Sequence, residues 1–120
     1  MHIGELAERT GLSLRTIRHY DDVGILPATG RTEGGFRVYT ETDASRLVLI
    51  RRMKPLGFTL DEMQELLAVT DALDVEEDPD ELTRLHVALD VFRSSAEERR
   101  EKLALTLERA DEFIERLRQY

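Results

Sequence analysis

The sequence predicts a mainly α-helical protein in which a winged helix-turn-helix head, with a small β-hairpin as its wing, is followed by a long C-terminal helix. Two short stretches with helical spacing of apolar residues flank a tight turn near the start. A Glu-Gly-Gly turn signal then separates two short extended pieces. The chain contains neither glycine nor proline from Asp80 to Tyr120, which permits one helix of roughly 60 Å.

The first two predicted helices have the order of a helix-turn-helix. Gly11 should end the first helix, and Ser13 should cap the second, because a serine hydroxyl accepts a hydrogen bond from a free N–H in the first turn. Each helix has one apolar face, formed by Ile3, Leu6 and Ala7 and then by Leu14, Ile17 and Tyr20. In this motif the second helix enters the major groove of DNA.

The outward face of the second helix carries Arg15, Arg18 and His19, whose donors suit phosphates and base edges. An ordinary solvated charged face is the alternative, and the agreement of cap, turn and wing argues against it. Tyr20 either packs in the core or reaches a phosphate with its hydroxyl. We assign the DNA contacts of the head to Ser13, Arg15, Thr16, Arg18, His19, Tyr20, Arg31, Arg37 and Tyr39.

A hairpin over Arg31–Thr32 and Arg37–Tyr39 would form the wing. Residues two apart on a strand share a face, so Arg37 and Tyr39 should point the same way. Arg37 could bind phosphate through two donors and Tyr39 through its hydroxyl. A surface pair on an edge strand is the alternative.

Two further helices should follow the wing. Thr42 could cap the first of them, which would bury Leu47, Ile50 and Met53 and end at Pro55 and Gly57. Thr59 and Glu62 have the spacing of a capping box at the start of the second. Arg51, Arg52 and Lys54 could touch flanking phosphates or form a solvated face.

The C-terminal segment has a heptad pattern of apolar residues, which comprises Leu82, Leu85, Leu89, Phe92 and Ala96, and then Leu103, Leu107, Ala110, Ile114 and Leu117. Arg99 and Arg100 interrupt it, and Ser94 and Ser95 could cap a new helix, so one helix and two helices both remain open. A single amphipathic rod cannot bury its own apolar stripe. We therefore expect a partner on the second set, from Leu103 to Leu117.

Charge is unevenly distributed along the chain. Residues 1–57 hold 9 Lys and Arg against 7 Asp and Glu, whereas residues 58–120 hold 8 against 18, within a total of −8. Phosphate attraction depends on the local face, so an acidic second half is compatible with a DNA-reading head. The chain has no cysteine, which excludes disulfides, thiolate zinc sites and thiol redox switches. No signal peptide or membrane span is apparent, and we expect a cytoplasmic protein.

Three blocks in this order, GLSLRTIRHYDDVGIL, GGFRVY and LGFTLDEMQELL, resemble the DNA-binding half of the MerR family of bacterial transcription regulators, from about Ile3 to Leu67. The resemblance implies a homodimer joined by an antiparallel coiled coil, a roughly palindromic promoter operator that is distorted on binding, and RNA polymerase as a further partner. Family members carry effector domains beyond this helix. Because the sequence ends at Tyr120, we expect no separate effector domain, and either no small-molecule effector or one that binds between the head and the C-terminal helix.

We therefore predict a DNA-binding domain over 1–70, an acidic linker over 71–79 and a dimerisation helix over 80–120, acting as a MerR-type regulator on double-stranded DNA. The alternative is a protein-interaction adaptor that keeps the helix-turn-helix core without binding DNA. His86 and Asp90 have metal-ligand spacing but lack further ligands, so we interpret them as a surface pair. We predict no metal, no cofactor and no enzymatic activity.

Overall fold

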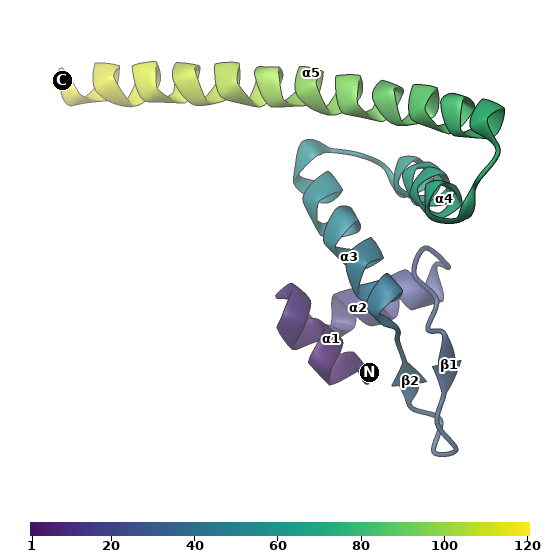
Figure 1. The fold of residues 1–120 in the computed structure, drawn as a ribbon. Coiled ribbons are helices and arrows are strands. Elements are labelled where there is room, and N and C mark those ends of the chain that lie inside the picture. The colour runs from purple at the N-terminus through teal and green to yellow at the C-terminus, as the bar shows by residue number, and fades with distance from the viewer. The chain divides into compact units, whose positions relative to one another are not determined.

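The computed structural model describes all residues from 1 to 120, which divide into two compact units, Met1–Leu67 and Ala68–Tyr120. The first unit is the head, and α4 runs from the head into the second unit. The helices and strands labelled in Figure 1 are α1 (Ile3–Thr10), α2 (Leu14–Asp22), β1 (Gly30–Arg31), β2 (Arg37–Val38), α3 (Glu41–Met53), α4 (Leu60–Val75) and α5 (Pro79–Arg118). A 3₁₀ turn, η1 (Lys54–Leu56), follows α3. The predicted fold class, mainly helical with one small hairpin, is confirmed.

The helix-turn-helix forms as the sequence predicts. Gly11 follows α1 in the left-handed region, with φ of 70°, and its N–H donates to the Ala7 carbonyl at 2.9 Å. A residue with a Cβ would be strained there, which explains why glycine ends this helix. Ser13 begins α2, and its hydroxyl accepts from the Thr16 N–H at 3.1 Å.

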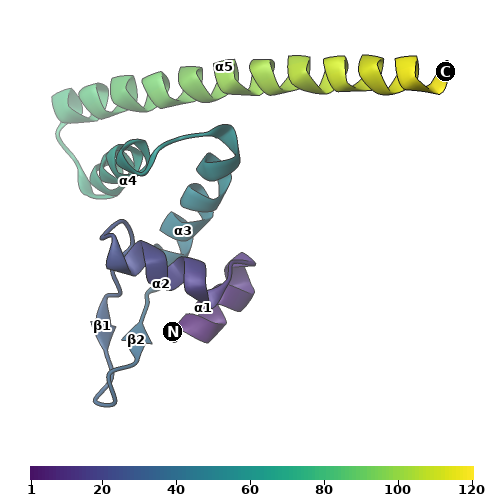
Figure 2. The same ribbon diagram turned by 180° about the vertical axis from the view of Figure 1, so that it is seen from behind.

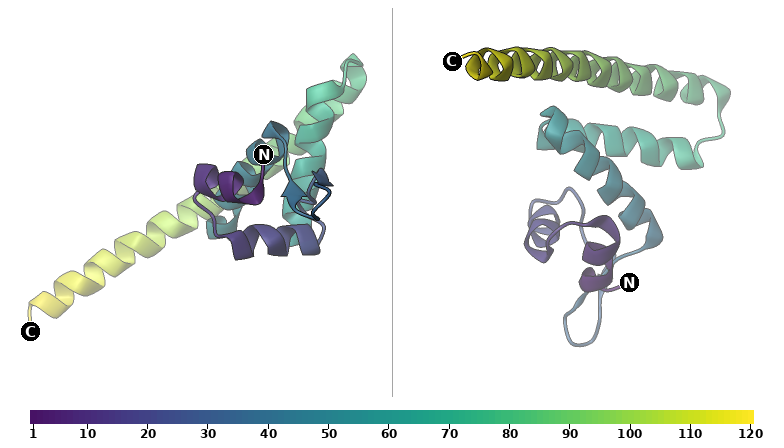
Figure 3. Two further views of the ribbon diagram at one scale, coloured as in Figure 1. Left: turned by 90° about the horizontal axis from the view of Figure 1, so that it is seen from below. Right: turned by 90° about the vertical axis from the view of Figure 1, so that its left-hand side faces the viewer.

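The wing is a short antiparallel hairpin in which Gly30 pairs with Val38 and Arg31 pairs with Arg37. It projects from the end of the head at which α2 stops, as Figure 2 shows. The right-hand view of Figure 3 shows the hairpin loop extending beyond the helices of the head. An isolated hairpin of this size is marginal in water, so its position depends on contacts with the helices.

Helix α3 begins two residues earlier than we predicted. Thr40, and not Thr42, is the N-cap: its hydroxyl accepts from the Asp43 N–H at 3.1 Å, and the Asp43 carboxylate accepts from the Thr40 N–H at 2.9 Å. This reciprocal capping box needs an acidic or amide side chain three residues after the cap, and Asp43 supplies it for Thr40. The helix ends at Met53, before the 3₁₀ turn that contains Pro55.

A compact apolar core holds the head together. Its fully buried side chains come from both helices of the helix-turn-helix, from the segments before and after the wing and from α3, and they are Leu6, Ile17, Leu26, Tyr39, Leu47 and Ile50. Arg9 of α1 and Glu41 of α3 form a bidentate ion pair on the surface, with both N···O distances at 2.7 Å. The core therefore fixes α2 and the wing on one small frame.

The predicted linker over 71–79 is wrong in its first part, because α4 continues to Val75. The acidic composition misled the prediction, since residues 71–75 include Ala72 and Leu73, which favour helix. Pro79 lies in the first turn of α5, where a proline is tolerated, and Asp78 caps that helix by accepting from the Glu81 N–H at 3.1 Å.

Helix α5 is one uninterrupted helix of 40 residues, so Ser94 and Ser95 do not start a new one (Figure 1). Arg99 donates to the Ser95 hydroxyl at 3.2 Å within the same helix. Every residue from 101 to 120 is exposed, including the predicted seam residues Leu103, Leu107, Ala110, Ile114 and Leu117. No helix of the structure combines the length and apolarity needed to cross a membrane.

Candidate nucleic-acid interface

Helix α2 presents three donors to solvent. Arg15, Arg18 and His19 are exposed, whereas Ile17 and Tyr20 on the opposite side are buried. This division follows from the 3.6-residue period, which places residues three apart on the same face. The helix therefore has one face fixed in the core and one face carrying two guanidiniums and an imidazole. Those groups match the acceptors of phosphates and base edges.

The first turn of α2 is stabilised by two hydroxyls. Besides the cap, the Ser13 and Thr16 hydroxyl oxygens lie 2.8 Å apart and share a hydrogen bond. Ser13 is exposed and Thr16 is half-buried. The structure thus places both predicted site residues at the N-terminal end of α2, where their hydroxyls orient the turn that precedes Arg15. Backbone N–H groups at a helix N-terminus also favour phosphate.

The wing contributes two arginines that lie opposite each other across the hairpin. Arg31 is about half exposed, and its guanidinium donates to the Gly35 carbonyl at 2.9 Å. Arg37 is less accessible, with a side chain 20% exposed. Its Nε donates to Asp21 Oδ2 at 2.5 Å, and one of its terminal nitrogens lies 3.5 Å from Asp22. Both arginines lie on the wing, where Arg31 and Arg37 are paired residues of the hairpin.

Asp21 connects the last turn of α2 to the wing. Its carboxylate accepts from Arg37 and from the Ala28 N–H at 3.2 Å, and Arg31 lies 3.8 Å away. Burial opposes ionisation of Asp21, but the hydrogen bonds from Arg37 and Ala28 outweigh it and hold the pKa of this carboxyl below its ordinary value. Asp21 is therefore charged at neutral pH and compensates charge at the base of the wing.

The assignment of Tyr39 to DNA contact is wrong. Its side chain is 1% exposed and lies in the core, and its hydroxyl is buried without a hydrogen-bond partner. Strand alternation does not apply, because β2 stops at Val38 and the Tyr39 N–H instead donates to the Met1 carbonyl at 2.7 Å. Burial raises the pKa of the Tyr39 phenol.

Tyr20 takes the first of its two predicted roles, since it is buried in the core. Its ring centroid lies 6.0 Å from that of His19, at a tilt of 43°. Burial raises the pKa of the Tyr20 phenol. Tyr20 therefore fixes the orientation of α2 and offers little surface to a ligand.

Arg51, one of the candidate flanking contacts, binds within the head. Its guanidinium donates to the Thr10 carbonyl at 2.6 Å and so stabilises the C-terminal end of α1. A Cβ at Gly11 would lie 3.3 Å from this guanidinium, which gives a second reason for glycine in the turn. Arg52 and Lys54 are exposed.

Sequence reasoning missed Asp21 and Asp43 as organising residues. Asp43 is 2% exposed and accepts hydrogen bonds from the Thr29 hydroxyl at 2.6 Å, from Thr40 and from Arg46 at 3.0 Å. Burial opposes its ionisation, and these bonds outweigh burial and lower its pKa. The capping-box spacing from Thr40 could have identified Asp43. No local signal identifies Asp21, because its guanidinium partner is 16 residues away.

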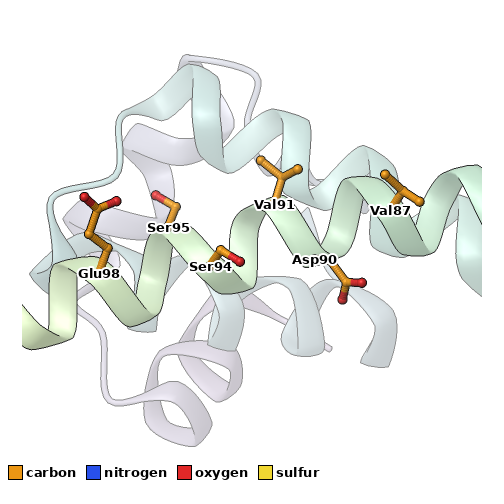
Figure 4. A pocket seen from close by; sticks show the side chains of 6 residues that line it. All are labelled: Val87, Asp90, Val91, Ser94, Ser95 and Glu98. Atoms are coloured by element: carbon orange, nitrogen blue, oxygen red, sulfur yellow. The ribbon is translucent and has the colours of Figure 1, made fainter.

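The surface of α5 carries an open groove lined by Val87, Asp90, Val91, Ser94, Ser95 and Glu98. Figure 4 shows that all six side chains come from this one helix. No group of three or more His, Cys, Asp or Glu side chains is placed to hold a metal ion.

These features define a winged helix-turn-helix protein that presents exposed basic residues on α2 and on the wing. A family profile described as MerR HTH family regulatory protein matches residues 1–69, and one described as MerR, DNA binding, matches residues 44–120. The chain belongs to the MerR family.

Relatives with curated names and solved structures agree with this assignment. The mercuric resistance operon regulatory protein of Bacillus cereus is 48% identical over 69 residues, which are 58% of this chain and 52% of that protein. The chain thus spans about half the length of this relative. The same holds for the Escherichia coli regulator ZntR, of which the match covers 48%.

Two solved structures cover nearly the whole chain. PbrR691 from Ralstonia metallidurans CH34, crystallised with lead(II), is 34% identical with a TM-score of 0.56, and the match covers 97% of this chain and 86% of that one. HiNmlR, a MerR family regulator lacking the sensor domain and bound to promoter DNA, is 26% identical with a TM-score of 0.66. That match covers 95% of this chain and 83% of the other.

Proposed function

We propose that this chain is a sequence-specific DNA-binding transcription regulator that binds a promoter operator as a homodimer in the cytoplasm. The observation that carries the proposal is the exposed face of Arg15, Arg18 and His19 on the second helix of a capped helix-turn-helix. The two wing arginines lie beside that helix and suit phosphate oxygens. The family assignment supports this function, since a member has been crystallised on promoter DNA.

The contacts divide into two kinds. Residues on the exposed face of α2 would read base edges, whereas Arg31 and Arg37 would bind the sugar-phosphate backbone and set the register. Replacing a base-reading arginine should weaken binding and relax sequence preference. Replacing a phosphate-binding arginine should weaken binding to every sequence and reduce the salt dependence.

Salt titration tests this division. Binding of the full chain to an operator duplex should weaken steeply as salt rises, with a log–log slope of about −0.9 for each phosphate contacted. Arg15→Ala should reduce discrimination between the operator and a duplex with one changed base pair. Arg93→Ala, an exposed arginine on α5, is the control and should leave affinity within about two-fold. Binding without salt dependence would contradict the proposal.

The dimer would form through the exposed apolar seam of α5. An antiparallel pair centred on Ala110 places Leu103 opposite Leu117 of the second copy and Leu107 within one residue of Ile114. The small side chain at the centre lets the two helices approach closely. Leu103, Leu107, Ile114 and Leu117 are each roughly half exposed in the single chain, and a second copy would bury them.

A dimer of this kind predicts operator symmetry, because two identical heads read two half-sites related by a two-fold axis. The length of α5 then sets the half-site spacing. Distortion of the DNA between the half-sites would cost of order 1–6 kcal/mol, supplied by phosphate contacts. We propose that RNA polymerase recognises the promoter in this distorted form. Electrophoresis of circularly permuted fragments would detect the bend.

A further inference from the structure

The contacts of Asp21 connect the end of α2 with the loop that follows it and with the two strands of the wing. Its carboxylate lies in the last turn of α2, and it accepts from Arg37 on β2 and from the Ala28 N–H in the connecting loop. Arg31 on β1 approaches the same carboxylate oxygen as Arg37, at 3.8 Å. One side chain thus links the recognition helix to both strands of the wing.

The accessibilities indicate that this arrangement is fixed and not a loose surface pair. The side chain of Asp21 is 15% exposed and that of Arg37 is 20% exposed, whereas the neighbouring Asp22 is 69% exposed. Exposed ion pairs contribute little, because solvent screens them and each side chain loses freedom. A partly buried carboxylate that also accepts from a backbone N–H holds its partner in one geometry.

Arg37 retains donors for a second acceptor while it is held. A guanidinium has five N–H groups in a fixed plane. The contacts with Asp21 and Asp22 occupy Nε and one terminal nitrogen, which leaves the other terminal nitrogen for a phosphate oxygen. Since the plane is fixed by Nε, the remaining donors point in one direction relative to α2.

We infer that Asp21 is a specificity-determining positioning residue for DNA recognition: it holds Arg37 and Arg31 in a set orientation relative to α2, so that wing and recognition helix engage DNA as a unit. This inference rests on the proposed function. Asp21 does not touch DNA, because a phosphate would repel its carboxylate. It acts by restraining two cations that would otherwise bind any backbone phosphate within reach.

The consequence of removing the carboxylate follows from that restraint. Asp21→Asn keeps the size of the side chain and an oxygen for the Ala28 N–H, but it replaces the charged acceptor of Arg37 with a neutral amide. Freed guanidiniums should strengthen binding to unrelated DNA through phosphate contacts. Binding to the operator should not gain equally, because the wing no longer presents its donors in register with α2.

Asp22→Asn is the matched control. It changes the net charge by the same amount at the adjacent position, but Asp22 is exposed and its single contact with Arg37 is longer, at 3.5 Å. If only the loss of negative charge mattered, Asp21→Asn and Asp22→Asn would behave alike. Each variant would then bind the operator and the unrelated duplex more tightly, by the same factor.

The test measures dissociation constants of the full-length variants for a selected operator and for an unrelated duplex of equal length, at several salt concentrations. Asp21→Asn should reduce the ratio of operator to unrelated affinity by about ten-fold, and Asp22→Asn should leave it within about two-fold. Arg37→Lys keeps the positive charge but loses the planar guanidinium, and it should lower the ratio as Asp21→Asn does. Combining it with Asp21→Asn should add little further loss.

Equal ratios in Asp21→Asn, Asp22→Asn and the wild type would overturn the role of Asp21 while leaving the proposed function in place. Wild-type protein that binds neither duplex would overturn the proposed function and, with it, this inference. Arg37→Lys gives an independent result if Asp21→Asn does not fold, because an unchanged ratio in Arg37→Lys would also contradict the restraint.

Discussion

Replacing Tyr39 by phenylalanine should stabilise the head. The hydroxyl of Tyr39 is buried and has no hydrogen-bond partner, in a side chain that is 1% exposed. Leaving a buried polar group unsatisfied costs about 1–3 kcal/mol, whereas removing it and keeping the ring preserves the packing. We therefore expect the free energy of unfolding to rise by about 1 kcal/mol. The change acts on the core alone, so affinity for an operator duplex should stay within about two-fold.

Denaturant unfolding at fixed protein concentration measures the first quantity, since a shift of the midpoint at constant slope reports stability. Tyr20→Phe is the control: Tyr20 is also a core tyrosine, but its hydroxyl is not a buried group without a partner. We expect its effect to be below about 0.5 kcal/mol. A stability loss in Tyr39→Phe would refute the argument from the unsatisfied hydroxyl, and a large loss of DNA affinity would restore Tyr39 as a phosphate contact.

Three further predictions concern other elements. Arg51→Ala removes the donor at the C-terminal end of α1 and should lower the free energy of unfolding by about 1 kcal/mol in a urea titration, whereas Arg52→Ala should change it by less than about 0.5. The pKa of Asp43 is lower in the folded state than in the unfolded chain, so the unfolded chain binds more protons in acid, and the free energy of unfolding should fall as the pH drops below about 5. Thermal unfolding measured at several pH values should show a weaker pH dependence in Asp43→Asn. Leu107→Asp should abolish dimerisation in sedimentation equilibrium, and a dimer that persists would contradict the seam.

The loss of dimer affinity on truncating Leu107 can be estimated from the two-fold symmetry of the proposed dimer. Truncating a buried leucine to alanine costs at least about 2 kcal/mol, and a two-fold interface contains the change twice. Leu107→Ala alone should therefore weaken the dimer by roughly a thousand-fold. Leu105 provides a matched control, because it is an exposed leucine about 200° around the helix from Leu103. Leu105→Ala should leave the dimer intact.

Local chemistry was sufficient to predict most of the head. Gly11, Ser13 and the Thr59–Glu62 capping box mark element ends through hydrogen bonds within four residues, and each forms as expected. The cap of α3 was misplaced because two threonines lie close together, although only Thr40 has an acidic residue three positions later. Helical periodicity likewise separated the exposed donors of α2 from its buried face.

The errors lie where the determining contact is distant or where packing decides. Tyr39 follows a strand of only two residues, so the alternation that predicted its exposure had already ended. Asp21 looks like an ordinary polar residue at a helix end until the fold brings the wing against it. The extent of α4 was underestimated because acidic composition was interpreted as a linker, although helix propensity permits those residues in a helix.

Selection of bound duplexes from a random DNA pool, with the purified chain at near-physiological salt, tests the central claim most directly. A dimeric reader should recover an inverted repeat with one fixed spacing between half-sites. Arg15→Ala should then recover a repeat with relaxed preference at a symmetric pair of positions. Recovery of no consensus, with weak and salt-sensitive binding only, would contradict the account and favour a helix-turn-helix adaptor that does not read DNA.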